Sequence, residues 1–508
     1  MSRISGFPRR LLAGLTAAAA AVFAVSFPAN AAVSRQFAGY LGDVNGDLLL
    51  DTADAVLLSR HLTADEPLGS SSLCADLDGN GRLNTADLTL LQNLLCTNAA
   101  PEAVYTETLL PDAPIDLLAP SLPARGESKI LLFAVDFPDC ARSADDSAAE
   151  IRAVAFGPQN PDSPLYPMES ISAYYERASY GRLHLTGDIY EYTAKYGIDR
   201  YVNDYELLLD EIMAALDSEI DYRMYDANGD ALIDTVLVVL PGSADETAWW
   251  PCSGAYIGRA EFDGMQVGNI CIGSRSPSDS AGFNSTWIHE LGHAMGLPDY
   301  YRYANFQGDA QGMGGDAGWE MMDDAFADMS AFSKLMCGWI AADEVQIYTG
   351  GTQTFTLRTA QDVPDCILIP RGELDGFLSE YFLIELNTAD MNNLYTFYEN
   401  VGYPIFEAGG VRILHCNAET WYGTNGYEFK WNNFGQNYDP SNNAQRVLRL
   451  VNDRAGFFGG GSVIGGGMPG FAWYGADGGR SLDPGVTVTV DGISEDGRSC
   501  MVTVSQNN

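Results

Sequence analysis

The pattern of apolar and polar residues divides the chain into stretches that predict different elements. An apolar run over residues 11–25 opens the chain, and amphipathic helices are predicted near residues 55–58 and 88–95. Residues 130–137 form an unbroken apolar run of buried-strand type. After residue 345 the pattern becomes β-rich. The remaining predicted elements are helices near 168–178 and 204–216, strands at 182–185 and 235–240, and a terminal hairpin of 486–490 and 501–504.

The first 31 residues predict an export signal. Arg3, Arg9 and Arg10 precede the apolar run, and Ala29-Asn30-Ala31 is typical of a cleavage site. The run is too short to span a bilayer, and no later segment reaches that length. We therefore expect a secreted, extracellular protein without a membrane span.

Charge narrows the choice of partners. The 508 residues include 68 Asp and Glu but 28 Lys and Arg, so the net charge of −40 becomes −43 without residues 1–31. Such acidity argues against nucleic acid and anionic membranes as partners. Nine cysteines show no CxxC spacing; Cys74/Cys96 and Cys252/Cys271 are the nearest pairs, and export permits disulfides without fixing their pairing.

The stretch 289–299, HELGHAMGLPD, predicts a zinc-hydrolase centre. On a helix capped by Asn284 or Ser285, His289 and His293 point from one face toward a single metal. Glu290 lies beside the metal as general base, and Gly296 turns the chain so that Asp299 becomes the third ligand. The alternative, an amphipathic helix with two surface histidines, is weakened because the chain has only five His.

An internal repeat at residues 43–54 and 76–87 predicts two calcium loops. Oxygen-bearing side chains occupy loop positions 1, 3, 5, 9 and 12, as in an EF-hand, and each loop runs into an amphipathic helix. The first set is Asp43, Asn45, Asp47, Asp51 and Asp54; the second is Asp76, Asp78, Asn80, Asn84 and Asp87.

This duplication resembles a type I dockerin over residues 40–97, with Thr-Ala at positions 10 and 11 and Asp at position 12. The resemblance implies an all-α module (residues 38–98) that binds two calcium ions and docks a cohesin domain of a scaffold protein. Leu48 stands at position 6 of the first loop, where glycine usually makes the turn, whereas Gly81 is in place in the second. A calcium-stabilised helix pair without a cohesin partner is the alternative.

A third acidic loop contains Asp226, Asn228, Asp230 and Asp234 and precedes a strand rather than a helix. Position 12 has no carboxylate, so the loop is not a complete EF-hand. It fits either a third calcium ion or a polar turn that caps a strand.

Further stretches resemble the immune inhibitor A family of secreted metallopeptidases. They are a pre-catalytic signature at 170–183, a methionine-turn at 318–322, the helix after it at 330–339, and β-rich segments at 380–385 and 410–415. The resemblance spans about residues 128–505. It implies zinc on His289, His293 and Asp299, with Glu290 catalytic and Met322 beneath the metal.

Met322 has an alternative role as a core gap-filler. His415 falls in a family-like strand without an assigned chemical role, and Tyr300 and Tyr301 are candidates for stabilising an oxyanion. Aromatic and Asn side chains between Trp421 and Tyr438 fit either a carbohydrate-binding surface or the lining of a substrate cleft.

The predicted fold is multidomain: an EF-hand-like dockerin, an α+β zincin catalytic domain resembling metzincins and a β-rich C-terminal region. The expected boundaries are signal peptide 1–31, dockerin 38–98, linker 99–127 (or a short inhibitory propeptide), catalytic domain 128–345 and C-terminal region 346–508.

The predicted function is that of a secreted zinc endopeptidase that cleaves proteins or peptides and is carried on a cellulosome-like scaffold. Its cofactors are one zinc and two dockerin calcium ions. An inactive zinc-site binding or adhesion module and a zinc hydrolase of non-peptide bonds are the rivals.

Overall fold

The computed structural model describes only part of the chain. The described residues are 32–47, 49–64, 67–68, 72–79, 82–97, 103–110, 115, 118, 120–163, 166, 168–202, 204–244, 249–256, 258, 260–276, 280–301, 320–324, 327–372, 374, 376–393, 409–423, 426–431, 446–452, 457–474 and 481–507. The expected export signal lies outside them, as do Leu48, Asn80, Gly81, Gly318 and Trp319.

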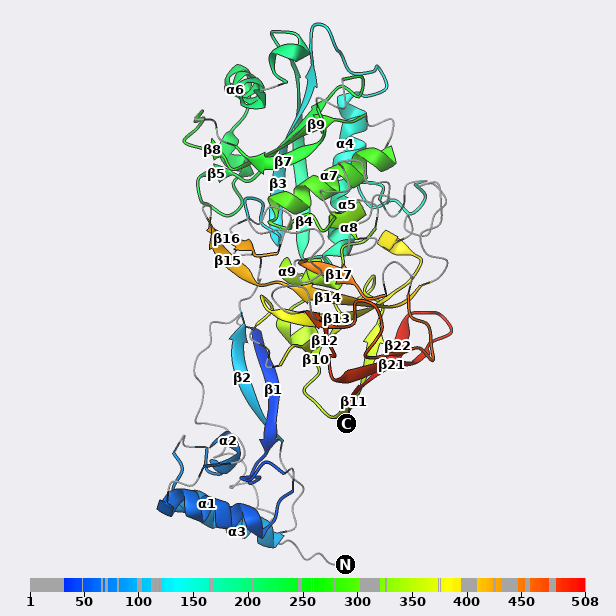
Figure 1. Cartoon of the computed structure of the whole chain (residues 1–508). Helices are drawn as coiled ribbons and strands as arrows, with labels where there is room; N and C mark the ends of the chain where they lie inside the picture. The colour runs from blue at the N-terminus through cyan, green and yellow to red at the C-terminus, as the bar shows by residue number, and fades with distance from the viewer. Residues whose placement is uncertain are drawn as a thin grey trace, which may run out of the picture. The chain divides into compact units, whose positions relative to one another are not determined.

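Two compact units divide the chain between Asp112 and Ala113 (Figure 1). The first consists of β1 (Ala32–Tyr40), α1 (Thr52–Ala64), α2 (Ser72–Ala75), α3 (Thr85–Thr97) and β2 (Ala103–Leu110). The two strands pair antiparallel, from Ala32 opposite Leu110 to Tyr40 opposite Ala103, and so join the ends of the helical module.

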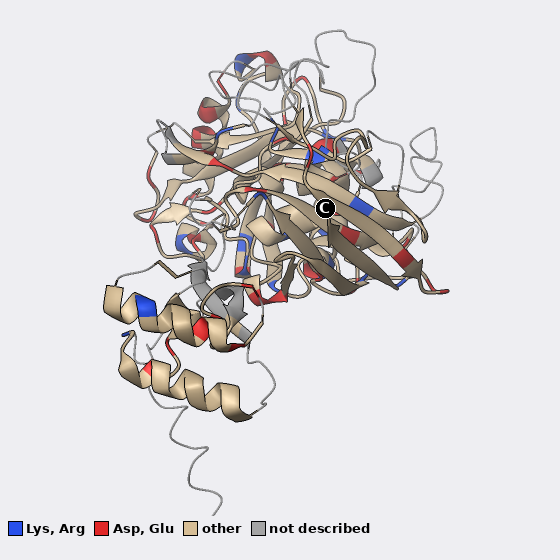
Figure 2. Cartoon of the chain, turned by 60° about the horizontal axis from the view of Figure 1, so that its bottom comes forward, with Lys and Arg blue, Asp and Glu red and all other residues tan. Residues whose placement is uncertain are grey.

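The two long helices of the first unit pack through a small apolar core. Leu58 of α1 and Leu91 of α3 are fully buried and share this core with Val44 and Ala75. Figure 2 shows few charged residues along either helix. Such helices need a partner surface against which to bury their apolar faces, and here each helix provides that surface for the other.

The second unit begins with an α/β region built on a mixed five-stranded sheet in the order β4-β3-β6-β9-β7. The first four strands run parallel, and the outer strand β7 pairs antiparallel with β9. Its strands are β3 (Gly126–Asp136), β4 (Leu183–Thr193), β6 (Val236–Leu240), β7 (Cys252–Ala255) and β9 (Asn269–Ser274), with a small pair β5 (Leu232–Ile233) and β8 (Gln266–Val267). Its helices are α4 (Ala148–Phe156), α5 (Ile171–Ala178), α6 (Tyr205–Leu216), α7 (Ser280–Ala294), α8 (Met321–Asp324) and α9 (Ala331–Met336).

This region has three layers, because successive side chains of a strand point to opposite faces of the sheet and both faces are covered by helices. Alternate residues of β3, such as Leu131 and Phe133, join a core with Leu208 and Ile212 of α6 on one face of the sheet. Helices α4, α5 and α7 cover the other face (Figure 1). The apolar run predicted as a buried strand is β3, and the strand and helix predictions for 182–185, 204–216 and 235–240 are confirmed as β4, α6 and β6.

Part of the expected linker 99–127 is built into the second unit. We call Ile115, Leu118 and residues 120–124 the strap. Ile115, Leu122 and Ala124 are buried, and the Leu122 N–H donates to the Ala294 carbonyl at 3.0 Å, at the end of α7. Residues 103–110 form β2 in the first unit, so the boundaries differ from those expected at both ends of this segment.

The C-terminal region is β-rich, as predicted, and consists of two sheets around one core. The sheets have the orders β10-β12-β13-β14-β17 and β11-β22-β21-β18, and the predicted terminal hairpin is β21 with β22. Phe382, Ile413, Val488 and Val502 belong to the shared core. The strands are β10 (Val345–Ile347), β11 (Thr352–Arg358), β12 (Cys366–Pro370), β13 (Glu380–Asn387), β14 (Gly410–Asn417), β15 (Thr420–Gly423), β16 (Gly426–Phe429), β17 (Leu448–Leu450), β18 (Val463–Ile464), β19 (Trp473–Tyr474), β20 (Ser481–Leu482), β21 (Val486–Ile493) and β22 (Ser499–Gln506).

Buried charges join the α/β region to the C-terminal region. Lys334 of α9 is fully buried; its Nζ donates to Asp328 Oδ2 at 2.7 Å and to the Ala360 carbonyl at 2.9 Å. Glu385 of β13 accepts from the Ala331 N–H at 2.6 Å and pairs with buried Arg412. Because buried charges need partners, these contacts fix how α9 sits on the sheet.

Neither of the two nearest cysteine pairs forms a disulfide bond. Ser253 lies directly opposite Cys271 in the β7–β9 ladder, and neighbouring Cys252 therefore points to the other face of the sheet. A bridge between Cys252 and Cys271 would need side chains on the same face.

None of the helices in the described part of the chain combines the length and the apolar character needed to cross a bilayer.

The buried pair of Lys334 and Asp328 predicts a large loss of stability when one partner is neutralised. Asp328→Asn leaves the Lys334 ammonium buried without a counter-charge, and we expect the free energy of unfolding of the second unit to fall by roughly 3–5 kcal/mol. Urea denaturation followed by tryptophan fluorescence measures this. Asp362→Asn, which breaks an exposed pair with Arg498, is the matched control and should cost less than about 1 kcal/mol. Equal losses in the two variants would contradict the prediction.

Candidate functional site

Helix α7 carries the zinc-hydrolase motif. Trp287, Ile288, Leu291 and Met295 are fully buried, as the pattern predicts. The helix starts at Ser280, so the expected cap at Asn284 or Ser285 is wrong. Buried Asn284 instead donates from Nδ2 to the Met168 carbonyl at 2.6 Å, a contact that ties α7 to the segment before α5. Tyr175 of α5 adds a second tie through the Ile288 carbonyl at 2.6 Å.

The turn after α7 brings the three predicted ligands together. Gly296 has φ +92°, a conformation that residues with a side chain disfavour, and the Leu297 N–H closes the helix end on the Gly292 carbonyl at 3.0 Å. Asp299 Oδ1 consequently lies 3.0 Å from His289 Nε2 and 3.2 Å from His293 Nε2. The three ligand atoms lie within 4.8 Å of one another.

Hydrogen bonds fix the direction of both imidazoles. His289 Nδ1 lies 2.8 Å from the Met321 carbonyl, and His293 Nδ1 lies 2.8 Å from the Leu297 carbonyl. A carbonyl oxygen only accepts, so each Nδ1 carries a proton and each Nε2 can present its lone pair to a metal. Two imidazole nitrogens and a carboxylate oxygen around one point fit a zinc ion with an open fourth position.

Charge at this cluster is strongly coupled. Burial lowers the pKa of His293, but the Asp299 carboxylate outweighs burial and raises this pKa to about 9. Burial would raise the pKa of Asp299, yet the His293 and His289 rings hold it well below its ordinary value. The cluster therefore favours a positive charge beside Asp299.

Glu290 lies on α7 next to the first histidine and is 6% exposed. Burial raises the pKa of its carboxyl, while both histidines lower it and Asp299 raises it. Helix α7, which carries Glu290, packs against β7, the outer strand of the sheet.

Met322 lies directly under the motif. A Cβ added at Gly292, between the two histidines, would come within 2.4 Å of Met322 Sδ, so only glycine permits this approach. Glu320 supports the turn: its carboxylate accepts from the Met322 N–H at 2.5 Å and from Ser333 Oγ at 2.6 Å. Glu320 belongs to the predicted methionine-turn at 318–322, but the sequence alone predicts no role for it.

The two tyrosines after Asp299 differ in position. Tyr300 is buried, and its hydroxyl is 3.0 Å from Ser333 Oγ, so it is a packing residue. The ring of Tyr301 stacks on His289, with ring centroids 6.2 Å apart, and burial and the Asp299 carboxylate raise the pKa of its hydroxyl. Of the two, Tyr301 is the one at the metal centre.

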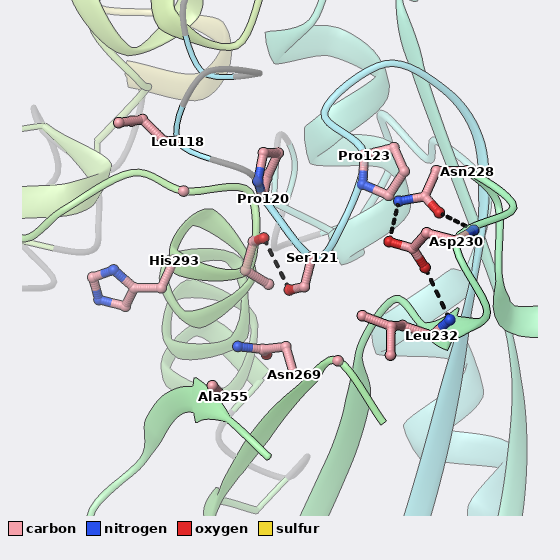
Figure 3. Close-up of a pocket in the computed structure, with 13 residues that line it drawn as sticks. Leu118, Pro120, Ser121, Pro123, Asn228, Asp230, Leu232, Ala255, Asn269 and His293 are labelled. Carbon is pink, nitrogen blue, oxygen red and sulfur yellow. Dashed lines mark hydrogen bonds between the residues drawn. The ribbon is translucent and has the colours of Figure 1, made fainter. Parts of the chain in front are cut away.

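A cavity of about 670 Å³ extends from the C-terminal end of α7 to the third acidic loop. Figure 3 shows His293 at one end, Asn228 and Asp230 at the other, and Ser121 of the strap between them. The Ser121 hydroxyl donates to the Ala294 carbonyl at 3.2 Å. The cavity also touches Ala255, the last residue of β7, so it runs alongside the outermost described strand of the sheet.

The third acidic loop folds around its own carboxylates. Asp226 Oδ1 accepts from the Gly229 N–H at 2.6 Å, and Asp234 accepts from the Ala227 N–H at 3.2 Å. Asp234 is 1% exposed. Burial chiefly, with Asp226 and Asp230 nearby, raises its pKa to about 7. The loop carboxylates thus accept the loop's own backbone N–H groups, and the third calcium site stays a prediction.

The two predicted calcium loops of the first unit share one hydrogen-bond pattern. Asp54 is fully buried and accepts from the Val44 N–H at 2.9 Å, and Asp87 does the same from the Leu77 N–H at 3.0 Å. Carboxylate oxygens of Asp76, Asp78 and Asp87 lie within 4.8 Å of one another. Asn80 lies outside the described residues.

Comparison with known families identifies this module. Residues 41–96 match the family model described as Dockerin type I domain. The N-terminal module is a type I dockerin. A search of curated proteins finds no match to the chain.

The dockerin implies calcium binding and attachment of the chain to a scaffold protein. Type I dockerins bind calcium, and a dockerin implies attachment to a cohesin-bearing scaffold, which suggests an extracellular, scaffold-bound protein. The position-12 carboxylates of both loops accept a backbone N–H from the start of their own loop, so both loops close in the same way. The predicted loop asymmetry at Leu48 and Gly81 falls on residues outside the described part.

The dockerin loops predict a graded response to calcium. Asp76→Ala should impair calcium binding and helix content more than Asp43→Ala, because the second loop has at position 6 the glycine that usually makes the turn, whereas the first has a leucine there. Calorimetric calcium titration and circular dichroism measure this, with the exposed Glu495→Ala as control. Cohesin binding should disappear in chelator. Equal calcium affinities in the two loop variants would contradict the ranking.

Proposed function

We propose that this protein is a secreted zinc-dependent endopeptidase carried on a cohesin-bearing scaffold by its dockerin. The observation that supports it best is the convergence of His289 Nε2, His293 Nε2 and Asp299 Oδ1 with both rings oriented by backbone carbonyls. The resemblance of residues 128–505 to the immune inhibitor A family, which rests on sequence motifs, agrees with this proposal.

The sheet edge supports a peptide as substrate. Strand β7 ends the sheet order, so its outer edge has no partner strand among the described residues. An extended peptide can pair with such an edge through its backbone and thereby lie across α7. The cavity that starts at His293 and Ala255 would then receive a substrate side chain.

The residues of this site divide the work of hydrolysis. His289, His293 and Asp299 would hold the zinc ion, which when bound supplies Lewis-acid activation of water and of the scissile carbonyl. Glu290 accepts the proton of the attacking water and passes it to the leaving amine. Tyr301, whose ring stacks on His289, would donate a hydrogen bond to the developing oxyanion. Met322 closes the floor beneath the two histidines.

Zinc content tests the ligand set. The mature protein should hold about one zinc per chain, and His293→Ala should release it, because two remaining ligands bind the metal weakly. Elemental analysis of both proteins measures this. His184→Ala is the matched control, since His184 is an exposed histidine paired with Glu176. Equal zinc in wild type and His293→Ala would refute the assignment.

Glu290 separates a peptidase from a binding module. Glu290→Ala should keep its zinc and lose at least about 100-fold in casein hydrolysis, because it removes the base and no ligand. Glu176→Ala, an exposed carboxylate outside the site, should keep full activity. Undiminished hydrolysis in Glu290→Ala would place the chemistry elsewhere. A zinc-loaded wild type without hydrolysis of any peptide bond would favour the scaffold-displayed binding module.

A further inference from the structure

A second cavity, of about 440 Å³, lies in the C-terminal region far along the chain from the zinc motif. It is enclosed by Arg449 of β17, the turn 466–472 and the β19–β20 hairpin. Its apolar lining comes from Met468, Pro469, Phe471 and Leu482. The lack of side chains at Gly466 and Gly467 leaves backbone groups on one wall.

Arg449 is a buried cation without a counter-charge. It is 5% exposed, its Nη1 atom has no hydrogen-bond partner, and it makes no ion pair with any residue in the described part of the chain. Its guanidinium lies 4.8 Å from the centre of the Tyr474 ring, another residue of the cavity wall. A buried, unpaired guanidinium is costly to maintain, and an anionic ligand would remove that cost.

The neighbouring acid is already engaged. Glu380 accepts from His415 Nε2 at 2.8 Å and also pairs with Arg371. His415 stands directly opposite Arg449 in the β14–β17 ladder, so both side chains lie on the same face of the sheet. Burial lowers the pKa of the His415 ring; Glu380 raises it, Arg449 and Arg371 lower it, and the net downward shift favours the neutral ring. The positive charge at the cavity is therefore that of Arg449.

Asp483 does not neutralise this charge. Its side chain is at the exposed rim of the cavity, where Oδ1 accepts from the Gly485 N–H at 2.8 Å. It makes no ion pair with Arg449, and its carboxylate lies against Gly466.

We propose that this cavity binds the C-terminal carboxylate of a peptide whose last side chain is apolar. The planar guanidinium matches a carboxylate in a two-point contact. The apolar walls receive the side chain, and the glycine backbone can meet the last peptide group. A sugar acid would need several polar side chains for its hydroxyls, whereas Ser481 and Asp483 are the polar side chains at the rim.

Calorimetric titration of the full chain with N-acetyl-leucine tests the proposal, with N-acetyl-leucinamide as the neutral isostere. We expect saturable binding of the acid and at least about tenfold weaker binding of the amide, because the contact with Arg449 needs the charge. Arg449→Gln should weaken binding of the acid by at least about tenfold. Arg358→Gln, at an exposed arginine paired with Asp365, should leave it unchanged.

A second variant keeps the test independent of the fold around Arg449. Leu482→Trp fills the cavity mouth from an exposed position and should also abolish binding. Absence of saturable binding, or binding that both variants leave intact, overturns the proposal. Binding that survives Arg449→Gln and disappears on zinc chelation would place the acid at the metal centre and also overturn it. Tighter binding of galacturonate than of N-acetyl-leucine would assign the cavity to sugar acids instead.

Discussion

The hydrogen bonds from the two histidine Nδ1 atoms to backbone carbonyls are the constraint on which the proposed metal centre depends. They decide which nitrogen of each ring faces Asp299, and a metal ligand set with the wrong tautomer would not converge. The two acceptors come from different places. Leu297 belongs to the turn after α7, whereas Met321 belongs to a segment that returns to the helix more than twenty residues later.

The position of Met321 ties the site to the C-terminal region. Buried Glu320 holds the turn through Met322 and Ser333, and Ser333 lies on α9. The first residue of α9, Ala331, donates to Glu385 of β13. A continuous set of buried hydrogen bonds therefore runs from the ring of His289 to the five-stranded sheet of the C-terminal region. In physical terms that region supports the orientation of a proposed metal ligand.

The features that depend on local residue spacing could be predicted from the sequence. Those that depend on contacts between distant segments could not. The spacing of His289 and His293, the turn at Gly296 and the approach of Asp299 follow from helix geometry and glycine φ. The start of α7 could not be read this way, because Asn284 bonds to Met168 across the fold and local capping rules do not include such a partner. The strap has a Pro-rich, aperiodic sequence typical of linkers, and only its docking on the end of α7 makes it part of the unit. The cavity at Arg449 likewise combines segments that share no local pattern.

The third acidic loop and the first dockerin loop share a sequence pattern but lead into different elements, a strand and a helix. Residues 43–51 and 226–234 share the order of Asp, Asn, Gly, Asp, Leu and Asp at equivalent positions. In the dockerin the closing carboxylate, Asp54, comes at position 12, at the start of α1. In the α/β region the N–H at loop position 2, that of Ala227, donates instead to Asp234 at position 9. The chain then continues into β6. The absence of an acid at position 12 therefore does not exclude a cation here, because an earlier carboxylate occupies the same place. Since Asn228 and Asp230 also wall the cavity that begins at His293, a cation held by this loop would stiffen the wall of the proposed substrate cleft opposite the metal-binding helix.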